Sequence, residues 1–182
     1  MKIKIGVMGS ADDTLTQSAG LTLREKAKEL GRAIGRSDAV LLSGATTGVV
    51  YLTGLAAHES GALHIGVSPA GNQQEHVKNY DLPTDACDAI IYTGFGLKGR
   101  NVVLVRSCDI VLFIAGSMGA LNEFTIAYDE GKIIGCLSQT GGVADEVAHL
   151  LRTFPKETQA RIFQDESPTR LVDSCIAAIS EV

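Results

Sequence analysis

One stretch constrains the fold more than any other. Five apolar residues, Ile110–Ile114, run without interruption into small residues and then into helical spacing. A short, unbroken apolar run is typical of a strand buried on both faces, as in parallel sheets. Ala115–Gly119 supplies small residues for a sharp turn, and from Ala120 apolar residues return at helical intervals, with Gly131 as a stop signal. The stretch therefore predicts a strand, a tight turn and a helix.

This unit has a chemical consequence. It directs backbone N–H groups and the positive end of a helix dipole toward one point, where a phosphate or carboxylate can bind. Glu123 falls in the first helical turn, where its charge would oppose an anion on the same amides. Glu123 therefore replaces a ligand there, faces another part of the ligand, or only favours the helix dipole.

The rest of the chain alternates in the same way. Further strands are predicted at 3–8, 40–42, 63–68, 89–92 and 132–137, with a short edge strand at 161–164. Helices are predicted over 21–35, 49–60, 99–107, 142–153 and 169–180, the last opened by Ser167 as N-cap and Pro168 at the first helical position. The alternation predicts one α/β domain over residues 1–182, a doubly wound, mainly parallel sheet with helices on both faces.

Residues 69–88 differ from the rest of the chain. They are polar, hold two of the four prolines and show no clear periodicity. A segment of this length without periodicity inside a compact domain is typical of a functional loop, so we expect a loop or lid here.

Composition excludes several classes of function. The chain has 182 residues, a net charge of −5 and 45% apolar residues, without a dense Lys/Arg run, so we expect no nucleic-acid partner. Its apolar segments are far shorter than the ~20 residues of a membrane helix, so no membrane partner is expected. Met1 leads directly into a strand without a signal-peptide pattern, which predicts a cytoplasmic location.

The cysteines and histidines show no metal-binding spacing. Cys87, Cys108, Cys136 and Cys175 form no CxxC pair, and we expect them to be reduced and mostly buried. We therefore expect neither a metal site nor a cofactor. His76, in the polar 69–88 segment, is the one histidine with a candidate role.

Several turns should meet at one edge of the sheet. Ligands of such sheets bind beyond the carboxyl ends of the strands, where the strand order reverses. Gly9-Ser10 is either a tight turn or a ligand contact, and Gly44–Gly48 is either a cap of the next helix through Thr47 or an anion cradle. Turns at 93–96 and 115–119 end at the same edge. Neither GxGxxG nor GxxxxGK[ST] is present, so no standard dinucleotide or P-loop site is predicted.

Arg100-Asn101 adds a cation to this edge. At the predicted start of a helix, Arg is electrostatically unfavourable unless it is solvated or paired with an anion. Arg100 could pair with Glu123 in a structural ion pair or bind a ligand phosphate in bidentate fashion.

These residues carry a resemblance. Arg100-Asn101, then the strand, then Gly116-x-x-Gly119-x-x-x-Glu123 resembles the Lonely Guy-type family, long mislabelled as lysine decarboxylases, with its signature PGGxGTxxE. Ser43–Val49 stands where that family has GGGxxGLM. The pattern is most similar to the small nucleotide-binding relatives that include molybdenum-cofactor carriers, through Thr93-Gly94, Arg100-Asn101, Ala127, Gly131-Lys132 and Thr140-Gly141-Gly142.

The resemblance implies a Rossmann-like homo-oligomer, a dimer or higher, that binds a nucleoside 5′-monophosphate. Active members hydrolyse the N-glycosidic bond and release the base and ribose 5-phosphate; the alternative is a non-catalytic carrier or sensor of a nucleotide or pterin. By position, Arg100 and Glu123 would be the catalytic pair. The implied ligand-binding residues are Gly9, Ser10, Gly44, Ala45, Thr46, Thr47, Gly48, Thr93, Gly94, Asn101, Gly116, Ser117, Met118, Gly119 and Ala120.

The chain departs from the family signature at three places in the turn. Ala115 and Ser117 stand within the PGG portion, and Ala120 replaces the threonine of GT, so one hydroxyl is missing. A lost hydrogen bond of this kind weakens a site by ~1 kcal/mol, while the backbone amides remain. Binding is therefore a firmer expectation than catalysis.

Overall fold

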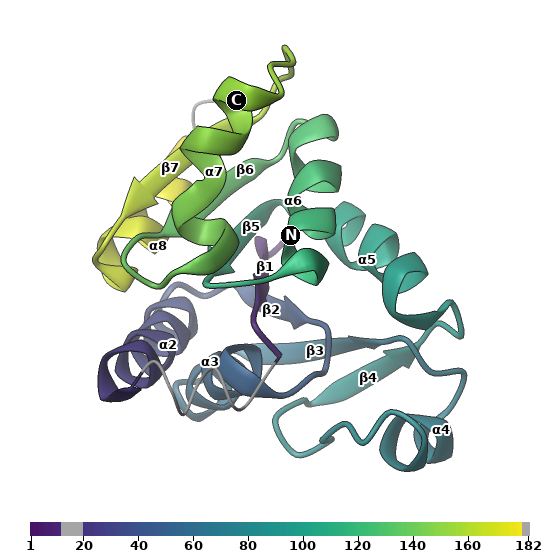
Figure 1. Ribbon diagram of the computed structural model, residues 1–182. Coiled ribbons are helices and arrows are strands. Elements are labelled where there is room, and N and C mark those ends of the chain that lie inside the picture. Colours follow the sequence, from purple (N-terminus) through teal and green to yellow (C-terminus); the bar gives the residue numbers. More distant parts are fainter. Residues whose placement is uncertain (12–19, 180–182) are drawn as a thin grey trace.

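The structure is a computed structural model that describes residues 1–11 and 20–179. Within these residues, seven parallel strands form one sheet in the order β4-β3-β2-β1-β5-β6-β7 (Figure 1). The strands are β1 (Lys4–Gly9), β2 (Val40–Ser43), β3 (Leu63–Ser68), β4 (Ala89–Tyr92), β5 (Ile110–Ile114), β6 (Ile133–Leu137) and β7 (Arg161–Asp165). The predicted doubly wound α/β fold is confirmed.

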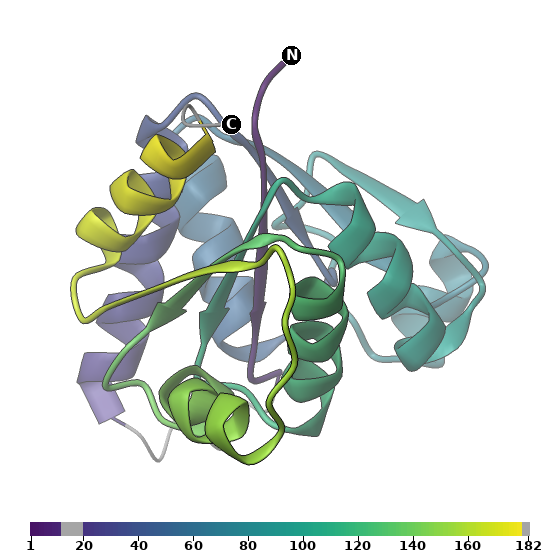
Figure 2. The ribbon, with the colours of Figure 1, turned by 90° about the horizontal axis from the view of Figure 1, so that it is seen from above.

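Helices cover both faces of the sheet, as Figures 1 and 2 show from two directions. One face carries α2 (Gly20–Arg36), α3 (Gly48–Glu59) and α8 (Pro168–Ile179), and the other carries α5 (Gly96–Ser107), α6 (Met118–Asp129) and α7 (Gly142–Thr153). Each helix turns an apolar stripe to the sheet: Leu30 and Ile34 of α2 are fully buried in one core, and Phe124 of α6 is buried in the other. No helix in the described ranges is long and apolar enough to cross a membrane.

Most predicted boundaries agree with the structure to within two residues, but α5 differs. It begins at Gly96, three residues before the predicted start at Gly99. The glycines at 94, 96 and 99 lower helix propensity, so the sequence pattern shortens this helix. Arg100 consequently lies in the second turn of α5, and the argument from an unfavourable helix start does not apply to it. The predicted end of the last helix, Ser180, lies outside the described residues.

The 69–88 segment contains regular structure that its sequence did not indicate. A short helix, α4 (Gln73–Lys78), lies at the β4 edge, where the ring of His76 meets Tyr92 at 6.0 Å between centroids. Its start is capped reciprocally, because Asn72 Oδ1 accepts from the Glu75 amide at 2.9 Å and Glu75 Oε2 accepts from the Gly71 amide at 2.8 Å. Polar residues with local capping therefore replace an apolar stripe here.

The fully buried His76 fixes this segment to the sheet. Its Nε2–H donates to the Pro83 carbonyl at 3.0 Å, and its Nδ1 accepts from the Ser68 hydroxyl at 2.8 Å. A carbonyl can only accept, which assigns this tautomer. The structure thus gives His76 a packing and hydrogen-bonding role inside the segment.

The strand order reverses between β1 and β5. The chain adds β2, β3 and β4 on one side of β1 and then crosses to place β5 on the other side. At this reversal a Cβ on Gly9 would lie 2.5 Å from the Ile114 carbonyl oxygen, so only glycine lets the two strand ends approach. A crevice for a ligand is expected at this point of the sheet.

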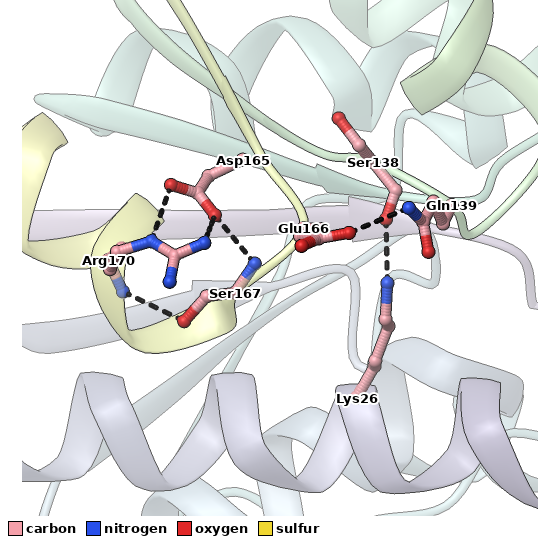
Figure 3. Close-up of polar contacts among 7 residues, drawn as sticks. All are labelled: Lys26, Ser138, Gln139, Asp165, Glu166, Ser167 and Arg170. Atoms are coloured by element: carbon pink, nitrogen blue, oxygen red, sulfur yellow. Dashed lines mark hydrogen bonds and ion pairs between the residues drawn. The ribbon is translucent and has the colours of Figure 1, made fainter.

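The carboxyl ends of β6 and β7 are closed by polar contacts (Figure 3). Arg170 of α8 forms a bidentate ion pair with Asp165, at 2.7 and 3.0 Å. Lys26 of α2 donates to the Ser138 carbonyl at 2.8 Å, and Gln139 donates to Glu166 at 2.7 Å. Ser167 caps α8 by accepting from the Arg170 amide at 3.4 Å, which confirms the predicted cap followed by Pro168.

Candidate functional site

A hollow of about 160 Å³ lies at the carboxyl ends of β1, β2 and β5, at the reversal of strand order. Both apolar and polar residues line it. The lining residues are Val7, Met8, Gly9, Ala11, Gly44, Thr46, Val50, Leu97, Lys98, Arg100, Asn101, Ser117, Gly119, Ala120 and Glu123. Nine of these were predicted from the sequence: Gly9, Gly44, Thr46, Arg100, Asn101, Ser117, Gly119, Ala120 and Glu123.

The turn from β5 to α6 forms one wall. Ala115 and Gly116 both have positive φ, +52° and +102°, so the chain reverses there in the left-handed region. Thr140 holds the turn, since its Oγ1 accepts from the Ala115 amide at 2.9 Å. The carbonyls of Ala115 and Gly116 accept from the first amides of α7, Ala144 and Val143, each at 3.0 Å.

The start of α6 presents unused donors to this hollow. The first amide of the helix with a partner is Leu121, which donates to the Ser117 carbonyl at 2.9 Å. The amides of Met118, Gly119 and Ala120 have no hydrogen-bond partner among the described residues. Unpaired amides at a helix N-terminus, together with the helix dipole, attract an anion.

Arg100 and Glu123 form a buried ion pair beside these amides. Arg100 Nη1 lies 3.2 Å from Glu123 Oε1, and the two residues are 7% and 6% exposed. Arg100 Nε is buried without a hydrogen-bond partner in the described structure. Removing a charged group from water without satisfying all its donors is costly, so this guanidinium has capacity for a further acceptor.

Burial dominates the protonation of the pair. Desolvation raises the pKa of Glu123 to about 7, although Arg100 and Lys98 act in the opposite direction. Desolvation also lowers the pKa of Arg100, and the Glu123 charge opposes that shift. A guanidinium stays protonated at neutral pH even so, whereas Glu123 exchanges its proton near neutrality.

Gly44 brings the turn after β2 against the guanidinium. A Cβ at this position would lie 2.6 to 2.8 Å from Arg100 Nη1, Nη2 and Cζ. The close approach requires glycine, which explains the residue type. Arg100 therefore lies against the 44–48 turn, and its partner Glu123, on α6, lines the same hollow as Gly44 and Thr46.

Three donors in and next to the 44–48 turn are used within the protein. The Ala45 amide donates to Ser43 Oγ at 3.1 Å, and the Val49 amide donates to the Ser10 carbonyl at 3.1 Å. The Thr47 hydroxyl donates to the Ala11 carbonyl at 2.5 Å, so Thr47 begins α3 without capping it through its side chain. Gly44 and Thr46 line the hollow, and Ala45 is buried beneath it.

The hydroxyl of Ser43 is itself fixed. It donates to Nε2 of the buried His64 at 2.8 Å, because the other ring nitrogen of His64 is taken up by the Ala86 carbonyl. Burial lowers the pKa of His64, which keeps the ring neutral and able to accept. The left-handed Ala45, with φ of +48°, is thus held by a hydrogen-bond chain inside the sheet.

Lys98 is a site residue that sequence reasoning missed. It is exposed, lines the hollow, and its Nζ lies 3.8 Å from where a Cβ of Gly119 would be. Its position two residues before Arg100 on α5 was the available signal. Lys98 and Arg100 together make the hollow cationic beside the unpaired amides.

Asn101 supports the ion pair from the same helix. With its amide nitrogen facing the acceptors around it, Asn101 donates to the Leu97 carbonyl at 3.0 Å and to Glu123 Oε1 at 3.1 Å. In this orientation the Asn101 oxygen accepts from the side-chain amide of Asn122 at 2.8 Å. Asn101 therefore orients Glu123 as well as lining the hollow.

The remaining predicted residues lie around the hollow without lining it. Thr93 donates to the Ser68 carbonyl at 2.7 Å, and the Gly94 amide donates to the Ala70 carbonyl at 2.9 Å, so both serve the neighbouring turn. Gly116 and Met118 shape the α6 turn, and Ser10 contributes its carbonyl to α3. Thr47 and Gly48 line a second, adjacent cavity.

The cysteines are all free, with three buried and Cys87 half-buried, which confirms that prediction. Among the described residues, no group of three or more His, Cys, Asp or Glu side chains is arranged to hold a metal ion.

The sequence pattern that defines the SLOG cluster4 family matches residues 2–172. The chain belongs to the SLOG cluster4 family. This assignment is broader than the Lonely Guy-type resemblance of the motifs. A protein of Archaeoglobus fulgidus without an assigned activity is 31% identical over 111 residues, 61% of this chain and 68% of that protein.

Two solved structures are similar over the full length. The molybdenum cofactor binding protein of Rippkaea orientalis is 28% identical with a TM-score of 0.73, covering 100% of this chain and 97% of that one. The structural genomics target TM1055 has a TM-score of 0.78 at 24% identity over 100% of both chains, which shows the shared fold alone.

The same fold also occurs in a DNA-binding protein. DNA processing protein A of Helicobacter pylori, whose structure concerns single-stranded DNA binding, has a TM-score of 0.66 at 16% identity over 97% of this SLOG chain and 81% of that protein. This likeness is one of fold only. The expectation of no nucleic-acid partner therefore stays a prediction from the charge pattern.

Proposed function

We propose that this SLOG protein binds a phosphorylated small molecule and acts as a carrier or sensor of a nucleotide or pterin. The phosphate occupies the hollow between α5 and α6. It accepts from the amides of Met118, Gly119 and Ala120 and is neutralised by Lys98 and Arg100.

One observation carries this proposal. The lining residues Gly119 and Ala120, whose amides have no partner among the described residues, meet the exposed Lys98 and the buried Arg100 in one hollow, and the unpaired Met118 amide lies next to them at the start of α6. An anionic ligand in this hollow would accept hydrogen bonds from the unpaired amides and would be neutralised by the two cationic side chains. The likeness to the molybdenum cofactor binding protein of R. orientalis supports a carrier role.

Ribose 5-phosphate tests the proposal, because a hollow of about 160 Å³, roughly five water volumes, has room for its phosphate group while the sugar extends from the mouth. Isothermal titration should show binding that inorganic phosphate competes away. Lys98→Met should weaken it about tenfold, the size expected for one charge-assisted contact. The matched variant Lys28→Met, on α2, should bind as the wild type does. Absence of binding, or equal loss in both variants, would contradict the proposal.

A second function, hydrolysis of an N-glycosidic bond, is favoured by Glu123. A carboxyl that lines the hollow with a pKa of about 7 can exchange a proton at neutral pH and, when ionised, can stabilise an oxocarbenium-like ribose. Arg100 and Asn101 orient it. Incubation with AMP and GMP should then release free base, and Glu123→Gln should abolish the release; equal release by that variant would exclude the role.

We also propose a homo-oligomer. Phe95, Leu97 and Met118 are 67%, 53% and 74% exposed at and beside the mouth of the hollow. Apolar side chains gathered on one surface are typical of interaction sites. Light scattering after size exclusion tests this: a monomer at micromolar concentration would contradict it.

A further inference from the structure

A second cavity lies beside the phosphate hollow and is larger, at about 450 Å³. Its walls are mainly apolar, with one aromatic ring and two charged groups. The lining residues are Arg24, Thr47, Gly48, Tyr51, Leu52, Val77, Asp81, Leu82 and Pro83. Apolar walls with a few polar groups are the usual composition of a small-molecule site.

The two cavities lie on different sides of the same segment, the start of α3. Thr46 lines the phosphate hollow, and its neighbours Thr47 and Gly48 line the second cavity. The same holds one turn later, where Val50 faces the first and Tyr51 the second. A ligand that occupies both cavities therefore passes over the start of α3.

The far wall is preformed by the 69–88 segment. The Leu82 amide donates to the His76 carbonyl at 3.2 Å, and the His76 ring donates to the Pro83 carbonyl at 3.0 Å. The Tyr51 hydroxyl donates to Asp85 at 2.9 Å, which fixes the ring that α3 contributes. A wall held in this way loses little freedom when a ligand enters.

Size divides the ligand between the cavities. Pockets for small molecules measure about 300–1,000 Å³. The phosphate hollow, at about 160 Å³, is too small for a whole nucleotide, whereas the second cavity, at about 450 Å³, lies within the range. The phosphate end of the ligand therefore fits the phosphate hollow, and a flat, largely apolar ring fits the second cavity.

Building on the proposed phosphate site, we propose that the second cavity binds the heterocycle of the same ligand and that Asp81 selects a 2-amino-4-oxo ring, the class shared by guanine and pterin. Asp81 lines the cavity as an exposed residue, so its carboxylate is open to a ligand that enters from solvent. Its φ of +52° holds it in an uncommon conformation for a non-glycine residue.

The ring class follows from donor geometry. A carboxylate accepts through both oxygens, so it matches a ring edge that offers two parallel N–H groups. The 2-amino-4-oxo ring has such an edge, in its ring N–H and amino group. Adenine offers an amino group beside a bare ring nitrogen, whose lone pair a carboxylate repels. Asp81 thus discriminates the two classes.

Titration calorimetry with four ligands tests the inference: ribose 5-phosphate, AMP, GMP and dihydroneopterin monophosphate. GMP, the pterin phosphate or both should bind at least tenfold more tightly than ribose 5-phosphate, and AMP more weakly than the tighter of the two. Which of them is tighter distinguishes a nucleotide source from a pterin source. If ribose 5-phosphate binds and neither 2-amino-4-oxo ligand binds more tightly, the inference is overturned while the proposed phosphate site stands; if ribose 5-phosphate fails to bind, the proposed function fails first.

Two variants locate the ring. Val77→Trp fills the second cavity from an exposed position, and Val102→Trp places the same residue at a similarly exposed site on α5, the two valines being 44% and 42% exposed. Val77→Trp should reduce GMP affinity at least tenfold to the level of ribose 5-phosphate and leave ribose 5-phosphate affinity unchanged. An equal effect of both tryptophans, or none at Val77, overturns the placement.

Asp81→Asn tests the selection. Asn tolerates a left-handed backbone well, so the fold is kept, and it presents one donor where the carboxylate accepted. GMP affinity should fall about tenfold and AMP affinity should change less than twofold. Asp173→Asn on the exposed side of α8 is the matched control. Equal losses for GMP and AMP would overturn the role of Asp81.

Discussion

The turn after β2 and the turn after β5 have similar backbone conformations, but their hydrogen-bond donors are used differently. Each contains an alanine in the left-handed region, Ala45 or Ala115, and each alanine amide donates to a hydroxyl, Ser43 or Thr140. In the first turn, the protein then uses further donors itself, at Val49 and Thr47. In the second, three amides at the start of α6 have no partner in the part of the chain that the structure describes.

The difference teaches that small residues in a turn do not by themselves make an anion site. Both turns satisfy the backbone requirement for a sharp reversal. Among the described residues, the β5–α6 turn leaves three helix-start amides without a partner, whereas the β2–α3 turn uses the Val49 amide and the Thr47 hydroxyl for contacts within the protein. The β2–α3 turn instead lets Arg100 approach through Gly44. One turn supplies donors and the other supplies room for a cation.

The largest effect is expected from removing one unpaired amide. Met118→Pro deletes the N–H at the first position of α6, where proline is tolerated, and the preceding Ser117 is already extended, with φ of −120°. Ribose 5-phosphate affinity should fall about 10- to 100-fold, the value of a hydrogen bond to a charged group. Calorimetry measures it. Gln73→Pro, at the first position of α4, should bind normally; an unaffected Met118→Pro would show that these amides are not used.

Next in size are the hydroxyls that hold the two alanines. Ser43→Ala and Thr140→Val each leave a buried amide without its acceptor, and each should lower the free energy of unfolding by about 1–3 kcal/mol in urea denaturation. Only Thr140→Val should also weaken ribose 5-phosphate severalfold, because it releases the turn that carries the donors. Equal losses of affinity in the two variants would show that both turns contribute equally to binding and would contradict the proposed difference.

A smaller effect is expected from pH. Because the pKa of Glu123 is raised to about 7, its carboxyl ionises as the pH rises from 6 to 8 and adds a negative charge beside the bound anion. Sulfate, which does not titrate in this range, should bind about fivefold more weakly at pH 8, or about 1 kcal/mol. Glu123→Gln should show no such change; a pH dependence that persists in this variant would assign it to another group.

The Glu123 carboxyl should also make the stability of the folded protein depend on pH. The folded state holds the Glu123 proton more tightly than the unfolded state, so stability falls as the pH rises from about 4.5 to about 7. Relative to Glu123→Gln, the wild-type melting temperature should decrease across that interval. An increase would mean that Arg100 depresses this pKa more than burial raises it.

The smallest effects are expected from Ala45→Gly and Ala115→Gly. Glycine relieves the left-handed strain of about 1 kcal/mol and costs about 0.5–1 kcal/mol of chain entropy, so each change in stability should lie within about 0.5 kcal/mol. Denaturant titration measures both. A gain well above this at only one alanine would show that the two turns are strained unequally.

The fold could be predicted because the strands are short apolar runs separated by amphipathic helices. Ile110–Ile114 is buried along its whole length, as its composition indicated. The start of α5 could not be predicted, since three glycines lower the helix propensity of that segment. Helix α4 could not be predicted either, because capping and the buried His76 stabilise it. Local propensity fails where tertiary contacts decide.

The site could be predicted in part. Arg100 and Glu123 were singled out by their charges near predicted helix starts and by the resemblance of their motifs to the Lonely Guy-type signature, although the helix-start argument for Arg100 did not hold. Lys98 was missed because an exposed lysine on a helix is ordinary in sequence and only the fold brings it to Gly119. The hydrogen bonds that Thr47 and Val49 donate could not be predicted from the sequence either, because their acceptors, the carbonyls of Ser10 and Ala11, lie more than thirty residues away in the chain.

The contact between α7 and the β5–α6 turn has a consequence for selectivity. The two carbonyl oxygens of Ala115 and Gly116 are occupied by the amides of Ala144 and Val143. The turn therefore shows its ligand N–H groups and withholds these C=O groups, which a potassium or magnesium ion would need. The backbone of this turn therefore presents hydrogen-bond donors but not these two acceptors to a ligand. The neighbouring helix α7, more than any side chain, makes the turn selective for anions.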